Sequence, residues 1–387
     1  MHGPFVVGQM EYPCTSVSES RTELLTVVDT SFRRRAAIVL LATLAVIIVL
    51  MAAVPIRTND LASRPRIMSG YESATAAIEQ RQRADARVAA RSGQSIFLGH
   101  GRRTPTAVLL LHGFTNSPQQ FDSLGQILYR QGDNVYIPRL PHHAELADGA
   151  LSRMSAEELR AASDSAVDVT EGLGDTVVVV GLSMGGTMAA WIAQYRAGVR
   201  RVVLVAPLMG LARVPNALEV PLANLALRLP NVSRADEPEQ REPDRELGWS
   251  SRAVGQILRL GFAVQRAAVD TQPAARDVAI LLNGNDHTIS ASPVLAVARR
   301  WRDHGAAVHV YQLPATLGLP HDFIDVRQPV RRPDVVYPLI DALVSGRLPS
   351  PGSVERVTLL ASQPGIAGHP IRVGREEEHH PAVGKLR

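Results

Sequence analysis

The sequence predicts an α/β fold, in which helices cover both faces of a mostly parallel sheet, preceded by a single transmembrane helix. Short apolar runs alternate with helix-compatible segments from about residue 95 to residue 348, as in sheets built by right-handed crossovers. Residues 177–180 are four consecutive valines, which fit a strand buried on both faces. The uncharged run from Ala36 to Val54 has nineteen residues, enough to cross a bilayer as a helix.

Each expected strand is followed by a segment whose apolar residues have helical spacing. Strands are expected at residues 107–111, 134–138, 177–180, 201–206, 278–282 and 308–311. Helices are expected at residues 119–130, 156–173, 187–193, 293–303 and 335–344. Ser155 and Glu158 form a capping box at the start of one of these helices. Side chains that follow the C-terminal ends of these strands should meet at one edge of the sheet, where parallel sheets bind ligands.

The charge composition excludes one class of partner. The net charge is +4 and the sequence pI is about 9.5. However, Lys385 is the one lysine, and the arginines are scattered among 37 acidic residues instead of being clustered on one element. We therefore expect no nucleic-acid partner. The single cysteine, Cys14, excludes an internal disulfide. The oligomeric state stays open.

The apolar run at residues 36–54 is expected to be a single-pass membrane anchor. Arg33, Arg34 and Arg35 precede it directly, which favours a cytoplasmic N-terminal segment (residues 1–35) and an extracytoplasmic main domain. A cleaved signal peptide and a buried core helix are the alternatives. The long N-terminal flank, the length of the run and the lack of a small-x-small site favour the anchor.

Two further segments flank the expected globular domain at residues 95–348. Residues 55–94 are rich in Ala, Glu, Gln and Arg over their second half and contain no β-rich run, so we expect a solvated helical stalk. Residues 349–387 are rich in Pro, Gly and charge, so we expect an unstructured tail.

A candidate nucleophile lies where the valine strand meets the next helix. The sequence there is Gly-Leu-Ser-Met-Gly, with Ser183 at its centre and Gly181 and Gly185 on either side. A serine on so sharp a turn is held in strained backbone geometry with its hydroxyl exposed, and a Cβ at either glycine would collide with a neighbouring element. The alternative is a serine that only caps a helix in a glycine-rich turn.

An acid and a base follow two later strands. Asp286 stands after the strand that ends at Leu282, and His321 stands after the strand that ends at Leu313. The order Ser, Asp, His along the chain is that of an α/β-hydrolase, and all three residues fall at the same edge of the expected sheet.

The region from about residue 95 to residue 348 resembles the α/β-hydrolase superfamily. It is most similar to bacterial carboxylesterases and monoacylglycerol lipases, whose oxyanion loop reads His-Gly-Phe-Thr, as at residues 112–115 here. Their nucleophile elbow reads Gly-Leu-Ser-Met-Gly-Gly, as at residues 181–186. The resemblance covers roughly two-thirds of the chain and implies a mostly parallel sheet with a cap insertion.

These residues predict a division of roles. His321 should take the proton of Ser183 during attack and return it to the leaving group. Asp286 should orient the imidazole and stabilise its charged form. The backbone N–H groups of Phe114 and Met184 should form the oxyanion hole. We expect no metal and no organic cofactor.

Other polar residues are alternative candidates for the site. Asp325 is the alternative acid, although a helix-face or capping role is favoured. His287 is expected to face solvent, and His142 and His143 are expected at the surface or at the pocket rim. The Glu-Glu-Glu-His-His run at residues 376–380 is interpreted as part of a solvated tail, not as a metal site.

Residues 209–277 have no place in the expected sheet and are interpreted as a cap over the site. Apolar residues at 218–229 and 257–264 predict two short helices. A lid lined by side chains such as Leu258 and Phe262 would suit an acyl chain, although packing against the core is the alternative for most of them.

Together these features predict a membrane-anchored serine hydrolase that cleaves carboxylic esters through an acyl-enzyme intermediate. Acylglycerols or other medium- and long-chain acyl esters are the expected substrates. Thioester hydrolysis, acyl transfer or peptide hydrolysis could use the same triad. A hydrolase-like binding module without catalysis is a third alternative, and the presence of all three triad residues argues against it.

Overall fold

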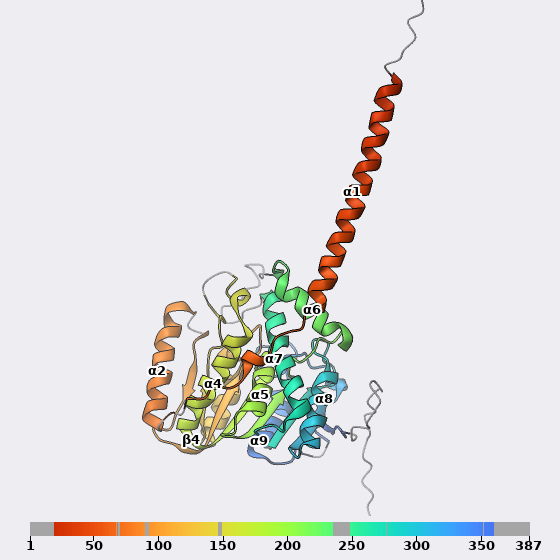
Figure 1. Ribbon diagram of the computed structural model, residues 1–387. Coiled ribbons are helices and arrows are strands. Elements are labelled where there is room, and N and C mark those ends of the chain that lie inside the picture. Colours follow the sequence, from red (N-terminus) through yellow and green to blue (C-terminus); the bar gives the residue numbers. More distant parts are fainter. Residues whose placement is uncertain are drawn as a thin grey trace, which may run out of the picture. The chain divides into compact units, whose positions relative to one another are not determined.

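The computed structural model describes residues 19–359, apart from residues 67, 69, 90–92, 146–148, 235–247, 276 and 351. For residues 19–31 it describes the backbone alone. The chain divides into two units, the first ending at Ala53 and the second, compact unit beginning at Val54. Figure 1 shows the sheet and helices of the second unit. Residues 360–387, most of the expected tail, lie outside the described residues.

Within the described residues, eight strands form one sheet in the order β1-β3-β2-β4-β5-β8-β9-β10. The six central strands are parallel, and the two edge strands are antiparallel. The strands are β1 (Ile96–Leu98), β2 (Thr104–Leu111), β3 (Asn134–Ile137), β4 (Gly174–Leu182), β5 (Val199–Val205), β8 (Asp277–Asn283), β9 (Ala307–Leu313) and β10 (Glu355–Arg356). The predicted α/β class is confirmed, because each expected strand coincides with one of the six parallel strands.

Helices cover both faces of this sheet. The described helices of this unit are α2 (Tyr71–Val88), α3 (Asp122–Arg130), α4 (Ala156–Leu173), α5 (Met184–Tyr195), α6 (Asn216–Arg228), α7 (Ser251–Asp270), α8 (Ala291–Asp303) and α9 (Pro333–Ser345). The connection from β2 to β3 runs in one direction along the sheet and that from β3 to β4 in the other. Right-handed crossovers therefore place α3 and α4 on opposite faces. Figure 1 shows α4, α5, α7 and α8 side by side over one face.

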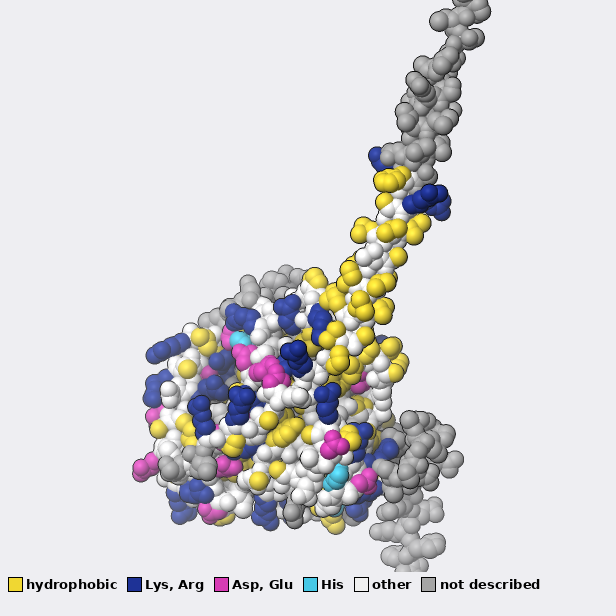
Figure 2. Space-filling model, viewed as in Figure 1, with side chains coloured by type: hydrophobic (Ala, Val, Ile, Leu, Met, Phe, Trp, Pro, Cys, Tyr) yellow, Lys and Arg dark blue, Asp and Glu magenta, His cyan; other side chains and the backbone are white. Residues whose placement is uncertain are grey.

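The helix α1 (Glu19–Ala53) contains the predicted anchor. Its segment Phe32–Ala53 has a mean hydropathy of 3.0 and is the one described helix that is long and apolar enough to span a membrane. A signal sequence near an N-terminus has the same length and composition. Figure 2 shows hydrophobic side chains covering the described length of this segment, with arginines at one end. The helix ends at Ala53, one residue before the predicted boundary.

The predicted solvated stalk at residues 55–94 is wrong, because the described residues of this segment are packed within the compact unit. Leu61 is fully buried, and its carbonyl accepts a hydrogen bond from Trp191 Nε1 at 2.8 Å. The helix α2 is present, but it buries Ala74 and Ile78 in the main core. We call residues 54–89 the post-span segment.

Acidic residues of α4 hold the post-span segment in place. Asp164 accepts hydrogen bonds from the Ser63 hydroxyl at 2.6 Å and from the Arg64 backbone N–H at 2.8 Å. Asp168 accepts one from the Arg66 backbone N–H at 2.9 Å. The sequence analysis missed this packing because the segment has few apolar residues and its polar partners lie about a hundred positions away in the chain.

The start of the predicted tail is also part of the fold. Strand β10 pairs with β9, with Glu355 opposite Gln312 and Arg356 opposite Tyr311. Val357 and Leu359 are buried beside it. A two-residue edge strand has too little apolar pattern to be found by sequence periodicity.

Part of the expected cap at residues 209–277 belongs to the helical layer over the sheet. Its two helices exist as α6 and α7, and between them in the chain a hairpin pairs the two-residue strands β6 (Ser233–Arg234) and β7 (Trp249–Ser250). However, α7 is 20 residues long and belongs to the helical layer over the sheet, because the crossover from β5 to β8 needs a helix on that face. Leu258 and Phe262, expected to line the lid, pack with Ile56 and Ala223 instead.

Candidate active site

Ser183 lies at the turn between β4 and α5 in a strained conformation. Its backbone has φ 56° and ψ −114°, and the residue is 7% exposed. A Cβ at Gly181 would lie 2.1 Å from the Gly185 carbonyl oxygen, and a Cβ at Gly185 would lie 2.0 Å from the Leu111 carbonyl oxygen. Both positions therefore require glycine, and the sharp turn expected from the sequence is present.

Neighbouring backbone groups fix this turn. The Ser183 N–H donates to the Val205 carbonyl at 3.0 Å, and the Ser183 carbonyl accepts from the Leu208 N–H at 3.1 Å. The carbonyl also accepts from Thr187, which starts the hydrogen bonding of α5. Met184 is the first residue of α5, so its N–H has no partner within the helix. The positive, N-terminal end of the α5 dipole lies at this same N–H group, beside Ser183. It favours a negative charge that develops there.

Asp286 and His321 form a hydrogen-bonded pair. His321 Nδ1 lies 2.7 Å from Asp286 Oδ2. The other oxygen of Asp286 accepts the backbone N–H groups of Thr288 at 2.8 Å and Ile289 at 3.1 Å. Burial opposes ionisation of Asp286, but the hydrogen bond and charge of His321, with these two N–H groups, lower its pKa below the ordinary value. The carboxylate is therefore charged at neutral pH and holds Nδ1 as a donor.

The second ring nitrogen of His321 is available for proton transfer. His321 Nε2 is buried and has no hydrogen-bond partner within the described residues. With Nδ1 donating to Asp286, a neutral imidazole presents a lone pair at Nε2. The loop that carries His321 is fixed to the Asp286 loop, because Asn283 Nδ2 donates to the carbonyls of Leu319 and Pro320, both at 2.9 Å.

The predicted oxyanion loop reaches both Ser183 and the His321 loop. A Cβ at Gly113 would lie 3.7 Å from Ser183 Cβ, so the two backbones are adjacent. The Gly113 N–H donates to Gln120 Oε1 at 2.7 Å, and Gln120 Nε2 donates to Asp322 Oδ2 at 2.7 Å. The loop at Phe114, the elbow and the His321 loop therefore converge at one edge of the sheet.

Two buried histidines support this loop, a role that the sequence analysis did not assign to them. The expectation of a surface or rim position for His143 is wrong, since it is fully buried and its Nε2 lies 2.8 Å from the Phe114 carbonyl. His112 Nδ1 lies 2.9 Å from the Gly113 carbonyl, and its Nε2 accepts the Leu140 N–H. Burial lowers the pKa of His143 to about 4 and that of His112 well below its usual value. Both rings are buried and support the loop through these contacts.

The other polar residues occupy different places. Asp325, the alternative acid, is 2% exposed, and its carboxylate binds Arg327 at 2.8 Å and Asn116 at 3.1 Å. It belongs to a buried polar network, not to the surface of a helix. His142 is partly buried between Glu145 and Glu158, and His287 is exposed as expected.

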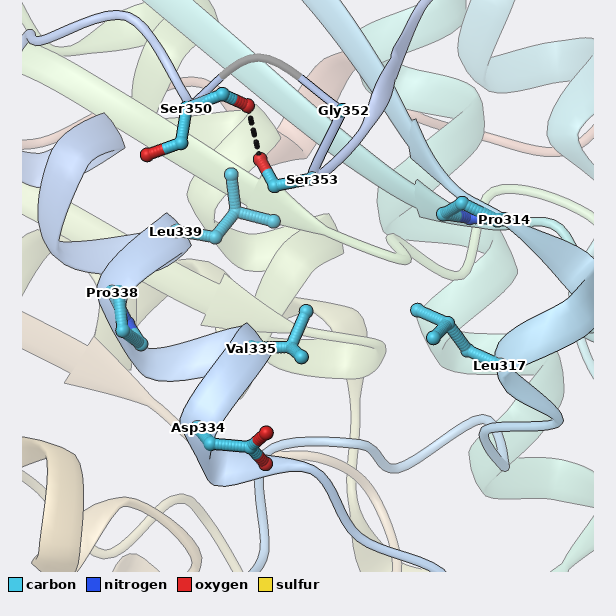
Figure 3. Close-up of a pocket in the computed structure, with 9 residues that line it drawn as sticks. All are labelled: Pro314, Leu317, Asp334, Val335, Pro338, Leu339, Ser350, Gly352 and Ser353. Atoms are coloured by element: carbon cyan, nitrogen blue, oxygen red, sulfur yellow. Dashed lines mark hydrogen bonds between the residues drawn. The ribbon is translucent and has the colours of Figure 1, made fainter.

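A cavity of about 340 Å³ lies near the His321 loop but does not include the candidate residues. Pro314 and Leu317, between β9 and His321, form one wall, and Val335 and Leu339 of α9 form the other. Figure 3 shows these walls, with the hydrogen bond between Ser353 and Ser350 at the rim. Among the described residues no group of three or more His, Cys, Asp or Glu is placed to hold a metal ion. The Glu- and His-rich run at 376–380 lies outside the described residues.

Comparison with known proteins places the chain among the hydrolases. A model of the alpha/beta hydrolase family matches residues 108–331, which is more than half of the chain. The chain is 24% identical to the thermostable monoacylglycerol lipase of Bacillus sp. (strain H-257) over 196 residues, covering 48% of this chain and 72% of that protein. The chain belongs to the alpha/beta hydrolase family, and the predicted resemblance is confirmed.

A solved structure with a TM-score above 0.5 agrees on the fold. One from work on LipS and LipT, two metagenome-derived lipolytic enzymes, superposes with a TM-score of 0.51 at 16% identity, over 67% of this chain and 100% of that chain. The monoacylglycerol lipase of Paleococcus ferrophilus has a TM-score of 0.49 at 17% identity, over 65% of this chain and 98% of that one. Family and relatives together support a carboxylic-ester hydrolase of the lipase or esterase type, as the sequence predicted.

Proposed function

We propose that this protein is a membrane-anchored serine hydrolase that cleaves carboxylic esters through Ser183, His321 and Asp286. One observation carries the proposal: His321 binds Asp286 through Nδ1 at 2.7 Å and keeps Nε2 buried and without a partner at the sheet edge that also holds Ser183. A histidine in this orientation can act as a general base, because its free nitrogen can accept the proton of a serine hydroxyl.

The reaction follows from these groups. Ser183 Oγ attacks the ester carbonyl while His321 Nε2 accepts its proton, and Asp286 stabilises the imidazolium. The resulting oxyanion accepts hydrogen bonds from the backbone N–H groups of Phe114 and Met184. Each of these donors stabilises the transition state by roughly 3 kcal/mol. The tetrahedral intermediate expels the alcohol, which takes the proton from His321 and leaves an acyl-serine. Water then repeats the sequence and releases the carboxylic acid.

Medium- or long-chain acyl esters, including acylglycerols, are the proposed substrates. The curated relative is a monoacylglycerol lipase, and a membrane anchor at Phe32–Ala53 would keep the enzyme beside a supply of lipid esters. Arg33, Arg34 and Arg35 at the start of this helix support an extracytoplasmic catalytic domain. In intact spheroplasts, added protease should then degrade the catalytic domain. Protection until the membrane is broken would reverse the topology.

The nucleophile is tested by Ser183→Ala in the full-length protein in detergent, with Ser290→Ala as the matched control. Turnover of p-nitrophenyl esters and labelling by a fluorophosphonate should both be abolished in the first variant and retained in the second. The alanine removes one hydroxyl, so the melting temperature should stay the same. Labelling of Ser183→Ala at another serine would show that the nucleophile is wrong.

The acid is tested by comparing Asp286→Asn with Asp325→Asn. The first should lower kcat about 10⁴-fold, because the amide cannot hold the productive imidazole tautomer. The second should lower stability and leave kcat per folded enzyme, measured by fluorophosphonate active-site titration, nearly unchanged. The reverse ranking would assign the acid to Asp325. A higher kcat/KM on acyl thioesters or peptides than on esters would change the proposed substrate class.

A further inference from the structure

Helix α6 buries polar residues and exposes apolar ones. Its buried residues are Glu219, Ala223 and Asn224. Leu218 and Leu222, one helical turn apart, are 50% and 43% exposed, and Val220 is 41% exposed. A surface helix of a protein surrounded by water shows the opposite arrangement. The exposed face therefore fits an apolar environment better than water.

Two contacts join α6 to the first residues that follow the apolar segment in the chain. Asn224 Nδ2 donates to the carbonyl of Val54 at 2.5 Å. Val54 directly follows Ala53, the last residue of the apolar segment. Ile56, two residues further on, is buried against Ala223 of α6. If the apolar segment crosses a bilayer, the chain leaves the bilayer close to Val54. The carbonyl of Val54 is hydrogen-bonded to α6.

The surroundings of α6 suit a lipid headgroup layer. Arg213 precedes the helix, Arg228 is its last residue, and both are exposed, as cations that bind lipid phosphates must be. The hairpin that follows α6 exposes Val232 by 61% and Trp249 by 40%. Tryptophan is enriched at the interface between membrane and water. Figure 2 shows hydrophobic side chains on the surface in the region of α6.

The chain that leads into α6 also borders the catalytic loops. The Leu208 N–H binds the Ser183 carbonyl at 3.1 Å, and the Ala212 N–H binds the Thr288 carbonyl at 3.1 Å. At the start of α6, Asn216 Nδ2 donates to Ser292 Oγ at 2.9 Å. A surface that includes α6 therefore reaches the rim of the site that holds Ser183 and Asp286.

We propose that α6 is an interfacial helix whose exposed apolar face lies in the headgroup–acyl boundary of the bilayer that holds α1, so that the site takes its ester substrate from that bilayer. The proposal rests on the membrane anchoring proposed above. It adds that the catalytic unit is not held away from the bilayer on a spacer. Instead, α6 and its hydrogen bond to Val54 hold the catalytic unit at the bilayer surface.

A depth measurement tests this placement. Cys14 is the single cysteine, so Cys14→Ser combined with Leu222→Cys allows one environment-sensitive fluorophore on α6 of the full-length protein. Val330→Cys is the control, because Val330 is 51% exposed in the loop before α9. In vesicles of phosphatidylcholine and phosphatidylglycerol, nitroxide-labelled lipids should quench the Leu222 probe, and aqueous iodide should quench the Val330 probe.

The outcomes separate the two proposals. Vesicle flotation with a Leu222 probe that iodide quenches as well as the Val330 probe would overturn the placement of α6 and leave the anchor intact. Loss of flotation would overturn the anchor and the placement with it. Quenching of the Leu222 probe by lipid nitroxides in floating vesicles supports both.

Activity provides the second test. The double variant Leu218→Gln/Leu222→Gln should turn over p-nitrophenyl acetate within about twofold of the parent, because both side chains are exposed. Its rate on a long-chain monoacylglycerol embedded in the same vesicles should fall about tenfold, since two leucines no longer enter the apolar layer. Val330→Gln should change neither rate. Equal losses on both esters would show that the leucines serve folding alone.

Discussion

Helices α6 and α7 come from the same stretch of chain between β5 and β8, yet they bury opposite kinds of residue. Helix α7 buries Ile257, Leu260 and Val264 completely in the main core. Helix α6 buries Glu219 and Asn224 and exposes Leu218 and Leu222. Both segments are apolar enough to be interpreted from sequence as lid helices. The difference shows that apolar content alone does not tell which face of a helix meets the core.

The sheet topology explains why α7 belongs to the core. A parallel connection from β5 to β8 must cross one face of the sheet, and α7 fills that place between α5 and α8. Helix α6 is an addition to this connection and packs on α7, with Leu227 and Ala226 close to Gly255. The fold requires α7, whereas α6 is not needed to connect the strands and can present its exposed face to an apolar environment.

The largest expected effect comes from matched truncations on the two helices. Leu260→Ala should lower the free energy of unfolding by about 2–5 kcal/mol, because it leaves a cavity in a closed core. Leu222→Ala should change it by no more than about 0.5 kcal/mol in detergent, because that side chain is already exposed. Denaturant unfolding of the full-length protein measures both values. Similar losses for the two variants would mean that α6 is a core helix.

The candidate catalytic residues could be proposed from the sequence because their signals are local. The elbow needs glycine at 181 and 185 for backbone contacts that any chain with this turn must make, and Asp286 and His321 follow strands that are plainly apolar. The alternation of such strands with helices also sufficed for the fold class.

The remaining features depend on partners far away in the chain. The post-span segment lies outside the matched family region, which begins at residue 108, and its packing is set by Asp164, Asp168 and Trp191. His143 is buried because the Phe114 loop folds over it, and nothing in the local sequence signals this. The polar face of α6 is buried because Asn224 meets Val54, a contact across 170 positions. Periodicity within a segment carries no information on such pairs.

A smaller effect is expected at the contact between α7 and the post-span segment. Arg259 binds Asp60 at 2.8 Å and Glu157 at 2.6 Å, and its Nε donates to the Arg57 carbonyl at 2.7 Å. Both acids are partly exposed, so solvent screens the pair. Arg259→Met keeps much of the side-chain volume and should lower the free energy of unfolding by about 1 kcal/mol.

The control for Arg259→Met is Arg332→Met, which removes the exposed pair with Asp334. This variant should show no measurable change in the denaturation midpoint. If Arg259→Met has no effect either, the outer face of α7 gains nothing from the post-span segment. Trypsin cleavage between Arg57 and Arg66 would then be as fast in the parent as in the variant.

The smallest expected effect tests the buried polar face of α6 directly. Glu219 is 4% exposed, and its Oε1 has no hydrogen-bond partner within the described residues. Burial raises the pKa of Glu219, and the Leu211 backbone N–H opposes this only in part. The folded state therefore binds the proton more tightly than the unfolded state does. The carboxylate consequently destabilises the fold above its folded pKa, and this penalty disappears as the pH falls below the unfolded value of about 4.3.

Glu219→Gln removes this charge at nearly constant volume. It should raise the free energy of unfolding by about 0.5 kcal/mol at pH 7.5 and by nothing at pH 4, measured by denaturant titration at both values. Glu79→Gln on α2, whose side chain is 65% exposed, should change stability at neither pH. A gain for Glu219→Gln that is the same at both pH values, or absent from both, would place the Glu219 carboxylate in water. Helix α6 would then bury no charge, and its contrast with α7 would rest on the exposed leucines alone.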